Sequence, residues 1–229
     1  IGERHLPVFQ AFMNGPTSGK DVFIPLSWII GGEEMAGQGW RMLMECLSIG
    51  RSISLPALGA GMSSTLYRYT GAYAKVREQF NTAIANFEGV QEALGYVAGY
   101  CYMINAARLM TAGAVDLKIN PSIVSAIAKC HLTEMTRRSV THAMDVHAGH
   151  GIQAGPRNTL LNAYLCAPIS ITVEGANILT RNLIIFGQGA IRCHPYILEE
   201  VALISAEKTD IDALDKTLMS HVGFYASNL

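Results

Sequence analysis

Apolar residues recur at helical spacing along most of this chain, and that spacing limits the folds open to it. The helical period begins at about Gly37, and a long helix is predicted to follow Arg51 and to run toward Arg77. Small residues crowd this stretch, which permits close approach of neighbouring helices. The first helical face holds Trp40, Leu43, Met44 and Leu47, and the small residues are Ala57, Gly59, Ala60, Gly61, Ser63 and Ser64.

Further helices are predicted downstream. Asn120 followed by Pro121 is typical of an N-cap with proline at the first helical position, and the helix it opens should reach about His147. Apolar spacing at 94–104 predicts another helix after a loop at 81–89, a short one covers 158–166, and the last begins near residue 174 and ends before 187 or 194. The predicted fold class is mainly α, an antiparallel helical bundle of roughly four or five helices.

The two ends of the chain differ from this bundle. Residues 1–35 are rich in Gly and Pro and carry a short β-like run at 22–24, which suggests the end of a β-rich domain. The bundle is assigned to 36–195, and the more polar residues 196–229 are interpreted as the start of an amphipathic C-terminal extension. Because the chain opens on Ile1, we expect a fragment or a processed chain.

Composition excludes several function classes. The net charge of -1 argues against a basic nucleic-acid-binding surface. No apolar run is long enough to cross a bilayer without a polar break, and no signal peptide opens the chain. The five cysteines are widely spread without a CxxC, which favours buried free thiols over disulfides or zinc. No metal site is expected, because His131, His142, His147 and His150 include no Glu-x-x-His pair.

Glu174 is the leading candidate for a catalytic base. It follows the apolar run 167–173 and stands just before a second mostly apolar run, 178–186. Apolar surroundings should raise the pKa of this carboxyl toward neutrality, which suits proton removal from carbon. The alternative is a structural glutamate placed at a helix N-terminus by the helix dipole.

Three further patterns each have a structural alternative. Arg51 lies in a mostly apolar stretch and either covers apolar surface or anchors a phosphate or carboxylate. Arg77 either interacts with a helix C-terminus or reaches a pyrophosphate, with Phe80 stacking nearby. The glycine pattern at 148–151 either ends a helix or lets the backbone approach a cofactor phosphate.

Five motifs follow one another along the chain: Gly50-Arg51, Arg77-x-Gln79-Phe80, Gln91-Glu92-x-Leu94, Ala148-Gly149-x-Gly151 and Glu174-Gly175-x-Asn177-x-Leu179-x-Arg181. In this order they resemble the C-terminal helical domain of the acyl-CoA dehydrogenase family, and the resemblance covers nearly the whole chain. The 26-residue step from Arg51 to Arg77 resembles the very-long-chain type, and the runs at 21–26, 35–43 and 186–195 resemble the large bacterial enzyme of fatty-acid β-oxidation.

The resemblance implies FAD-dependent oxidation of a medium- or long-chain acyl-CoA to the trans-2-enoyl-CoA. Glu174 would remove the pro-R α-proton while the β-hydride passes to N5 of FAD, with Arg51 and Gly175 on the substrate side. The implied FAD contacts are Arg77, Gln79, Phe80, Val90, Gln91, the segment Asp145 to Gly149 (with Ala148) and Asn177. The resemblance also implies a homo-oligomer, electron-transfer flavoprotein as acceptor, and a bacterial cytoplasmic location that leaves peripheral association with the inner membrane open.

The sequence departs from the family pattern at three positions. Asp145 replaces the usual Gln, Ala148 the first Gly, and Ala176 the usual Thr. The family's N-terminal helical domain and most of its β-domain lie outside this sequence, so we expect the fragment alone to be inactive and to bind FAD weakly or not at all. The alternatives are an acyl-CoA oxidase and a non-catalytic helical oligomerisation or interaction domain.

Overall fold

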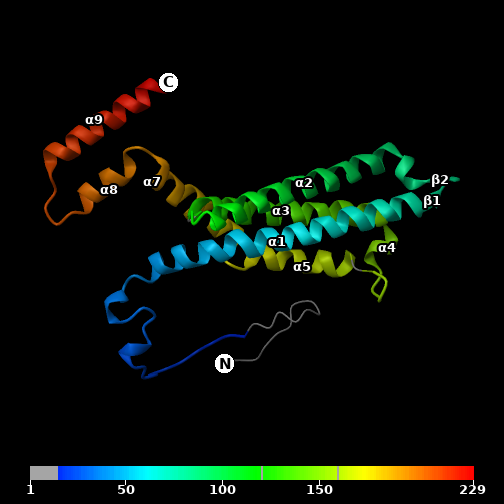
Figure 1. Ribbon diagram of the computed structural model, residues 1–229, viewed down its shortest axis with the longest axis horizontal. Coiled ribbons are helices and arrows are strands. Elements are labelled where there is room, and N and C mark those ends of the chain that lie inside the picture. Colours follow the sequence, from blue (N-terminus) through cyan, green and yellow to red (C-terminus); the bar gives the residue numbers. More distant parts are fainter. Residues whose placement is uncertain (1–14, 120, 159) are drawn as a thin grey trace. The chain divides into compact units, whose positions relative to one another are not determined.

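The computed structural model describes residues 15–119, 121–158 and 160–229 (Figure 1). The chain divides into two compact units, Ile1–Ala176 and Asn177–Leu229. Each is described by itself below.

The first unit is an antiparallel helical bundle, as the apolar spacing predicts. The helices α1, α2 and α3 pack against one another with alternating direction, and α5 packs mainly on α3 (Figure 1). Their bounds are α1 Gly39–Val76, α2 Glu88–Asp116, α3 Ser122–His147 and α5 Leu160–Thr172, with a single turn, α4, at Gly149–Ile152. Shorter elements are the 3-10 turns η1 Leu26–Trp28, η2 Glu33–Met35 and η3 Ile84–Asn86 and the strands β1 Glu78–Gln79 and β2 Thr82–Ala83.

Small residues let the long helices approach closely, as the sequence predicts. Gly59 of α1 faces α3, where an added Cβ would lie 3.0 Å from Oγ1 of Thr136. Next to it, Ala60 packs with Ile104 of α2 and Leu132 of α3 in one buried cluster. The close approach of three helix backbones is therefore fixed by side-chain size.

Helix α1 continues through Pro56, although proline normally breaks a helix. Proline has no N–H, so the carbonyl of Ser52, four residues earlier, loses its helical donor. Thr111 of α2 donates its hydroxyl to that carbonyl at 2.8 Å, and both residues are buried. A neighbouring helix thus supplies the missing hydrogen bond.

The expectations for residues 22–24 and 81–89 differ from the structure. Residues 22–24 form no strand, and Phe23 is 89% exposed, because the described residues offer these backbone groups no strand to pair with. The loop predicted at 81–89 instead contains the hairpin strand β2, paired antiparallel with β1, and the turn η3, and α2 already begins at Glu88.

The second unit is helical throughout. Its elements are α6 Asn177–Leu179, the π-helix η4 Thr180–Gln188, α7 Gly189–Cys193, α8 Ile197–Ser205 and α9 Ile211–Ser227. Asp210 caps α9 by accepting from the Ala213 N–H at 3.0 Å. His221 of α9 contacts Glu200 of α8 at 2.6 Å, which ties these two helices together.

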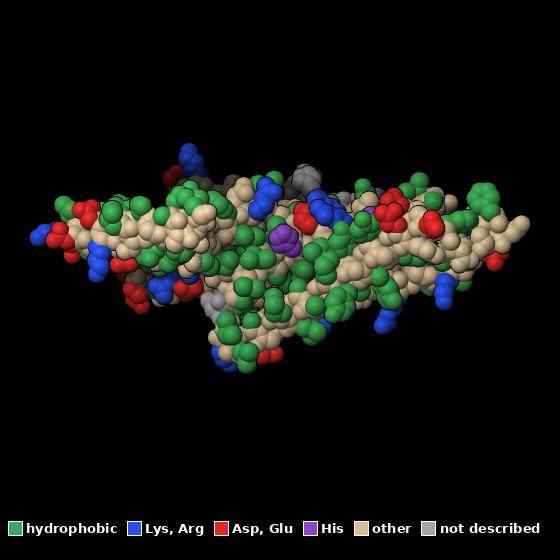
Figure 2. Space-filling view, turned by 90° about the horizontal axis from the view of Figure 1, so that it is seen from above, with side chains coloured by type: hydrophobic (Ala, Val, Ile, Leu, Met, Phe, Trp, Pro, Cys, Tyr) green, Lys and Arg blue, Asp and Glu red, His purple; other side chains and the backbone are tan. Residues whose placement is uncertain are grey.

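The surface keeps many apolar side chains, and green hydrophobic atoms are frequent on the face shown in Figure 2. Within the described ranges, no helix is both long and apolar enough to span a membrane. All five cysteines are free, as predicted, but only Cys130 is buried; Cys46 and Cys193 are exposed. The expectation of uniformly buried thiols is wrong.

Candidate functional site

Glu174 lies in a tight turn between α5 and α6, not at a helix start. Helix α5 ends at Thr172, and α6 begins at Asn177. Glu174 has φ 54° and Gly175 has φ 91°, so two successive residues adopt left-handed backbone conformations. The sequence prediction of a helix beginning at Glu174 is off by three residues. The helix-dipole alternative loses its basis, because Glu174 follows a helix C-terminus.

Arg51 of α1 holds this turn from one side. Its side chain is almost fully buried, at 3% exposure, and its Nε donates to the backbone carbonyl of Glu174 at 3.1 Å. Burial lowers the pKa of Arg51, and attraction to Glu174 opposes that change. Oε2 of Glu174 and Nη1 of Arg51 are both buried and have no hydrogen-bond partner among the described residues. The structure therefore brings together two groups that the sequence predicted to act at one site.

Lys129 of α3 holds the same turn, and the sequence analysis missed it. The residue is completely buried, and its Nζ donates to the carbonyls of Ile171 at 2.8 Å and Gly175 at 2.7 Å. Burial lowers the pKa of Lys129 to about 8, partly offset by neighbouring groups that include Glu174. A signal existed: Lys129 falls four residues after Ser125 and three before Leu132, on the buried face of a predicted helix.

A second group of predicted residues lines a pocket at the other end of α1. The pocket has a volume of about 720 Å³ and is walled by α1, η3, α2 and the α3–α4 junction. The predicted residues in its wall are Arg77, Gln79, Phe80, Val90, Ala148 and Gly149. Three others are not in its wall: the Gln91 amide donates to the Ala85 carbonyl at 3.0 Å, Asp145 is exposed beside the junction, and Asn177 is a buried residue of the second unit.

The turn at Ala148 shapes one wall of this pocket. Helix α3 ends where Ala148 adopts φ 47° and ψ -131°, and α4 begins at the next residue. A non-glycine residue rarely takes such a backbone conformation. The glycine pattern therefore does end a helix, as one interpretation held, and the same turn also faces the pocket.

His147 is the most unusual residue of the pocket wall. Its ring is 1% exposed and stacks on Tyr73 at a centroid distance of 3.9 Å, yet neither ring nitrogen has a hydrogen-bond partner in the described part of the chain. Burial, and then the neighbouring His150, lowers the pKa of His147 to about 4. The imidazole is therefore neutral at physiological pH. The described residues contain no cluster of three or more His, Cys, Asp or Glu that could hold a metal.

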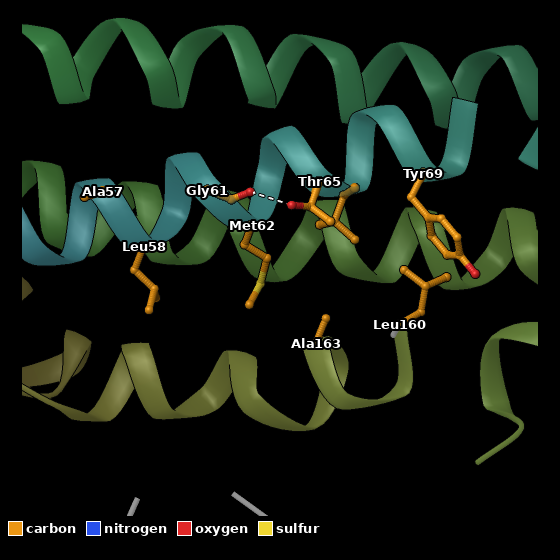
Figure 3. Close-up of a pocket in the computed structure, with 9 residues that line it drawn as sticks. Ala57, Leu58, Gly61, Met62, Thr65, Tyr69, Leu160 and Ala163 are labelled. Atoms are coloured by element: carbon orange, nitrogen blue, oxygen red, sulfur yellow. Dashed lines mark hydrogen bonds between the residues drawn. The ribbon is translucent and has the colours of Figure 1, made fainter. Parts of the chain in front are cut away.

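A third cavity lies between α1 and α5 and is mostly apolar (Figure 3). Leu58 and Met62 of α1 point toward α5, and Leu160 and Ala163 of α5 complete the lining, around a volume of about 360 Å³. Thr65 donates its hydroxyl to the Gly61 carbonyl of its own helix at 3.0 Å. Among the described residues, the lining has no carboxylate, ammonium, imidazole or thiol group, and the hydroxyl of Tyr69 donates to the Arg157 carbonyl at 3.2 Å.

Comparison with known families shows the family to which the chain belongs. Residues 37–187 match the family model described as "Acyl-CoA dehydrogenase, C-terminal domain", which covers more than half of the chain. The chain belongs to the acyl-CoA dehydrogenase family. Residues 191–229 match a second family model, "Acyl-CoA dehydrogenase, C-terminal, bacterial type". The family resemblance drawn from the motifs is thereby confirmed.

One relative agrees with this assignment by its name, and one solved structure shares the fold. The probable acyl-CoA dehydrogenase YngJ of Bacillus subtilis is 31% identical over 58% of this chain and 34% of its own length. A crystal structure of an acyl-CoA dehydrogenase from Geobacillus kaustophilus superposes with a TM-score of 0.61 at 24% identity, over 66% of this chain and 39% of that one. A 72-residue stretch is 60% identical to Protein HemX of Proteus mirabilis, over 31% of this chain and 42% of that protein. The chain thus spans well under half the length of these relatives.

Proposed function

We propose that this acyl-CoA dehydrogenase family chain supplies the catalytic base of an FAD-dependent enzyme that oxidises medium- or long-chain acyl-CoA in fatty-acid β-oxidation. The base is Glu174, and the observation that carries the proposal is its buried, unpartnered Oε2 on a turn held by Arg51. A thioester α-proton is weakly acidic, so the base must be held in position and kept from water. Arg51 and Gly175 are proposed to border the substrate.

The pocket at Arg77 suits the ADP part of FAD. Arg77 offers a permanent cation for the pyrophosphate, and the ring of Phe80, 89% exposed, is available to stack on the adenine. The pocket volume lies within the range of small-molecule sites. When bound, FAD accepts the hydride from the substrate β-carbon. Gln91, Asp145 and Asn177 stay predicted FAD contacts outside this wall.

The spacing of the two sites supports a homo-oligomer. Arg51 lies in α1, and Arg77 immediately follows the last residue of that helix. The 26 residues between them correspond to a rise of about 39 Å at about 1.5 Å per residue. This separation exceeds the length of an extended FAD. One FAD therefore cannot reach both the base and the Arg77 pocket of one chain, so the two sites of a chain would serve different FAD molecules.

The electron acceptor proposed is electron-transfer flavoprotein, which follows from the family resemblance, as does the bacterial cytoplasmic location. An acyl-CoA oxidase differs by letting O2 reach the reduced flavin. Reoxidation of the reduced enzyme by air at a catalytically competent rate would favour the oxidase. A series of saturated acyl-CoA substrates from short to long measures the chain-length preference.

The central test replaces Glu174 by Gln in the full-length protein. Gln keeps the size of the side chain and removes its basicity. Anaerobic mixing with acyl-CoA should bleach the flavin absorbance about 10²- to 10⁴-fold more slowly than in the wild type, the contribution of a general base. FAD content and acyl-CoA binding should be unchanged.

Glu92→Gln, at an exposed position on α2, is the matched control and should reduce at the wild-type rate. If Glu174→Gln reduces as fast as the wild type, Glu174 is not the base. If the full-length wild type neither holds FAD nor reacts with any acyl-CoA, the alternative of a non-catalytic oligomerisation or interaction domain is favoured.

A further inference from the structure

The turn that carries Glu174 is intrinsically unfavourable. The left-handed region disfavours a non-glycine residue, because its Cβ comes too close to the following carbonyl oxygen, and Glu174 has φ 54°. Gly175 continues the turn with φ 91°, which glycine tolerates. Such a conformation persists only where the surrounding structure enforces it. The direction of the Glu174 side chain therefore depends on whatever holds the backbone on both sides.

Lys129 holds the backbone on both sides of Glu174. Ile171 lies in the last turn of α5, where carbonyls lack helical partners, and Gly175 immediately follows Glu174. Nζ of Lys129 donates to both of these carbonyls, at 2.8 and 2.7 Å. One ammonium group therefore bridges the chain across the base, while Arg51 fixes the carbonyl of Glu174 itself.

Electrostatics makes a lysine at this place costly unless it has partners. A buried ammonium loses the hydration that stabilises its charge, as each member of a buried ion pair does. The charged or ionisable groups that influence Lys129 are Arg51 on α1, Glu174 in the turn, and Cys130 and Glu134 on α3. Attraction to Glu174 and the two carbonyl hydrogen bonds offset part of the desolvation. The cation is thus coupled both to the turn and to the carboxylate.

We propose that Lys129 is a positioning residue for the base: it clamps the carbonyls that flank Glu174 and thereby fixes the direction of the carboxylate. This inference rests on the proposed function of Glu174. It assigns Lys129 no contact with substrate or FAD. A purely structural cap of α5 is the competing role, and it predicts lost stability without a specific loss of reactivity.

The test uses Lys129→Met in the full-length, FAD-loaded protein. Met keeps the length of the side chain and removes every donor. Because small misplacement of a reacting group costs rate steeply, flavin reduction in anaerobic single turnover should slow about 10- to 100-fold. The acyl-CoA dissociation constant, read from the flavin spectrum, should change less than about threefold, since binding does not require an aligned base. Thr136→Val, a buried position seven residues along α3, is the control and should stay within about twofold in rate.

A double-mutant cycle separates positioning from capping. If Lys129 acts through Glu174, Lys129→Met should cause no further loss of rate in the Glu174→Gln background. Full additivity of the two losses would overturn the proposal, and so would a wild-type reduction rate in Lys129→Met while Glu174→Gln is inactive. A wild-type rate in Glu174→Gln would instead refute the proposed function itself.

Lys129→Gln covers the case in which the Met variant fails to fold. Its amide keeps two N–H donors on a shorter, uncharged side chain. If Lys129→Met folds, we expect the flavin of Lys129→Gln to be reduced at a rate between those of the wild type and Lys129→Met. If Lys129→Met does not fold, we expect Lys129→Gln to be reduced at least about threefold more slowly than the wild type, with an unchanged dissociation constant for acyl-CoA. Wild-type reduction by the Gln variant would contradict the clamp.

Discussion

The buried His147 should make the stability of this domain fall steeply in mild acid. Its ring stacks on Tyr73, is 1% exposed, and has two ring nitrogens without a partner among the described residues. Protonation would place a cation at this position with little compensating solvation. The perturbation that isolates this effect is His147→Phe, which keeps an aromatic ring against Tyr73 and removes the titration.

The sign and size of the change in stability follow from the pKa of His147. Burial lowers the pKa of His147 from 6.5 to about 4. Between these values the unfolded chain binds more protons at this position than the folded chain, so stability rises with pH across the window. The contribution of the neutral His147 ring to the free energy of unfolding is complete above pH 6.5 and is lost as the pH falls to about 4. At about 1.4 kcal/mol per pH unit, the loss amounts to roughly 3 kcal/mol.

Hydrogen exchange of peptides from the end of α3 measures this pH-dependent loss of stability locally in the full-length protein. Opening free energies, corrected for intrinsic exchange rates, would be compared between wild type and His147→Phe from pH 7 down to pH 4. The difference between the two proteins should shift by roughly 3 kcal/mol in favour of the variant as the pH falls. The exposed His131→Phe on the same helix supplies the reference profile. Parallel curves for wild type and His147→Phe would refute the argument, whatever their offset at pH 7.

Four further substitutions test packing, the turn and the pocket. Gly59→Ala should destabilise the protein by about 1–3 kcal/mol in chemical denaturation, because the new Cβ meets Thr136 at 3.0 Å. Its control, Gly61→Ala, has open space around the new Cβ and should be neutral or stabilising by up to about 1 kcal/mol. Gly175→Ala should cost about 1–2 kcal/mol, since φ 91° disfavours a side chain, and should slow flavin reduction in stopped flow. Arg77→Ala should weaken FAD binding by about 10-fold or more in titrations of the apoprotein, as expected for loss of a charged hydrogen-bond donor; unchanged affinity would remove the pyrophosphate assignment.

Helix existence was predictable because it depends on local spacing. The apolar spacing at 94–104 corresponds to α2. The predicted N-cap Asn120 lies outside the described residues, and Pro121 precedes α3, which begins at Ser122, one residue later than predicted. Pro56 shows the limit of local rules: on sequence alone it argues for a break, but the Thr111 hydroxyl on another helix compensates for the lost hydrogen bond. Thr111 is 59 residues from Ser52 in the sequence, so this hydrogen bond leaves no local signal.

The site was predictable in its residue types and less so in its geometry. Glu174 and Arg51 were singled out because both are charged residues within apolar stretches, and they do meet at one turn. The position of Glu174 after α5 was missed because α5 extends to Thr172, past the predicted end at Cys166 and through Pro168. Apolar spacing alone cannot tell one continuous helix from two short ones across a proline.

Lys129 shows what a local reading of charge leaves out. A lysine within a helix is ordinarily solvated, so its charge alone carries no prediction. Its place on the buried face of α3 conflicts with that expectation, and conflicts of this kind concentrate at functional sites. The conflict is resolved only when α5 brings the carbonyls of Ile171 and Gly175 to Nζ. The same contacts that compensate a buried cation therefore also hold the backbone on both sides of Glu174, which couples the burial of Lys129 to the conformation of this turn.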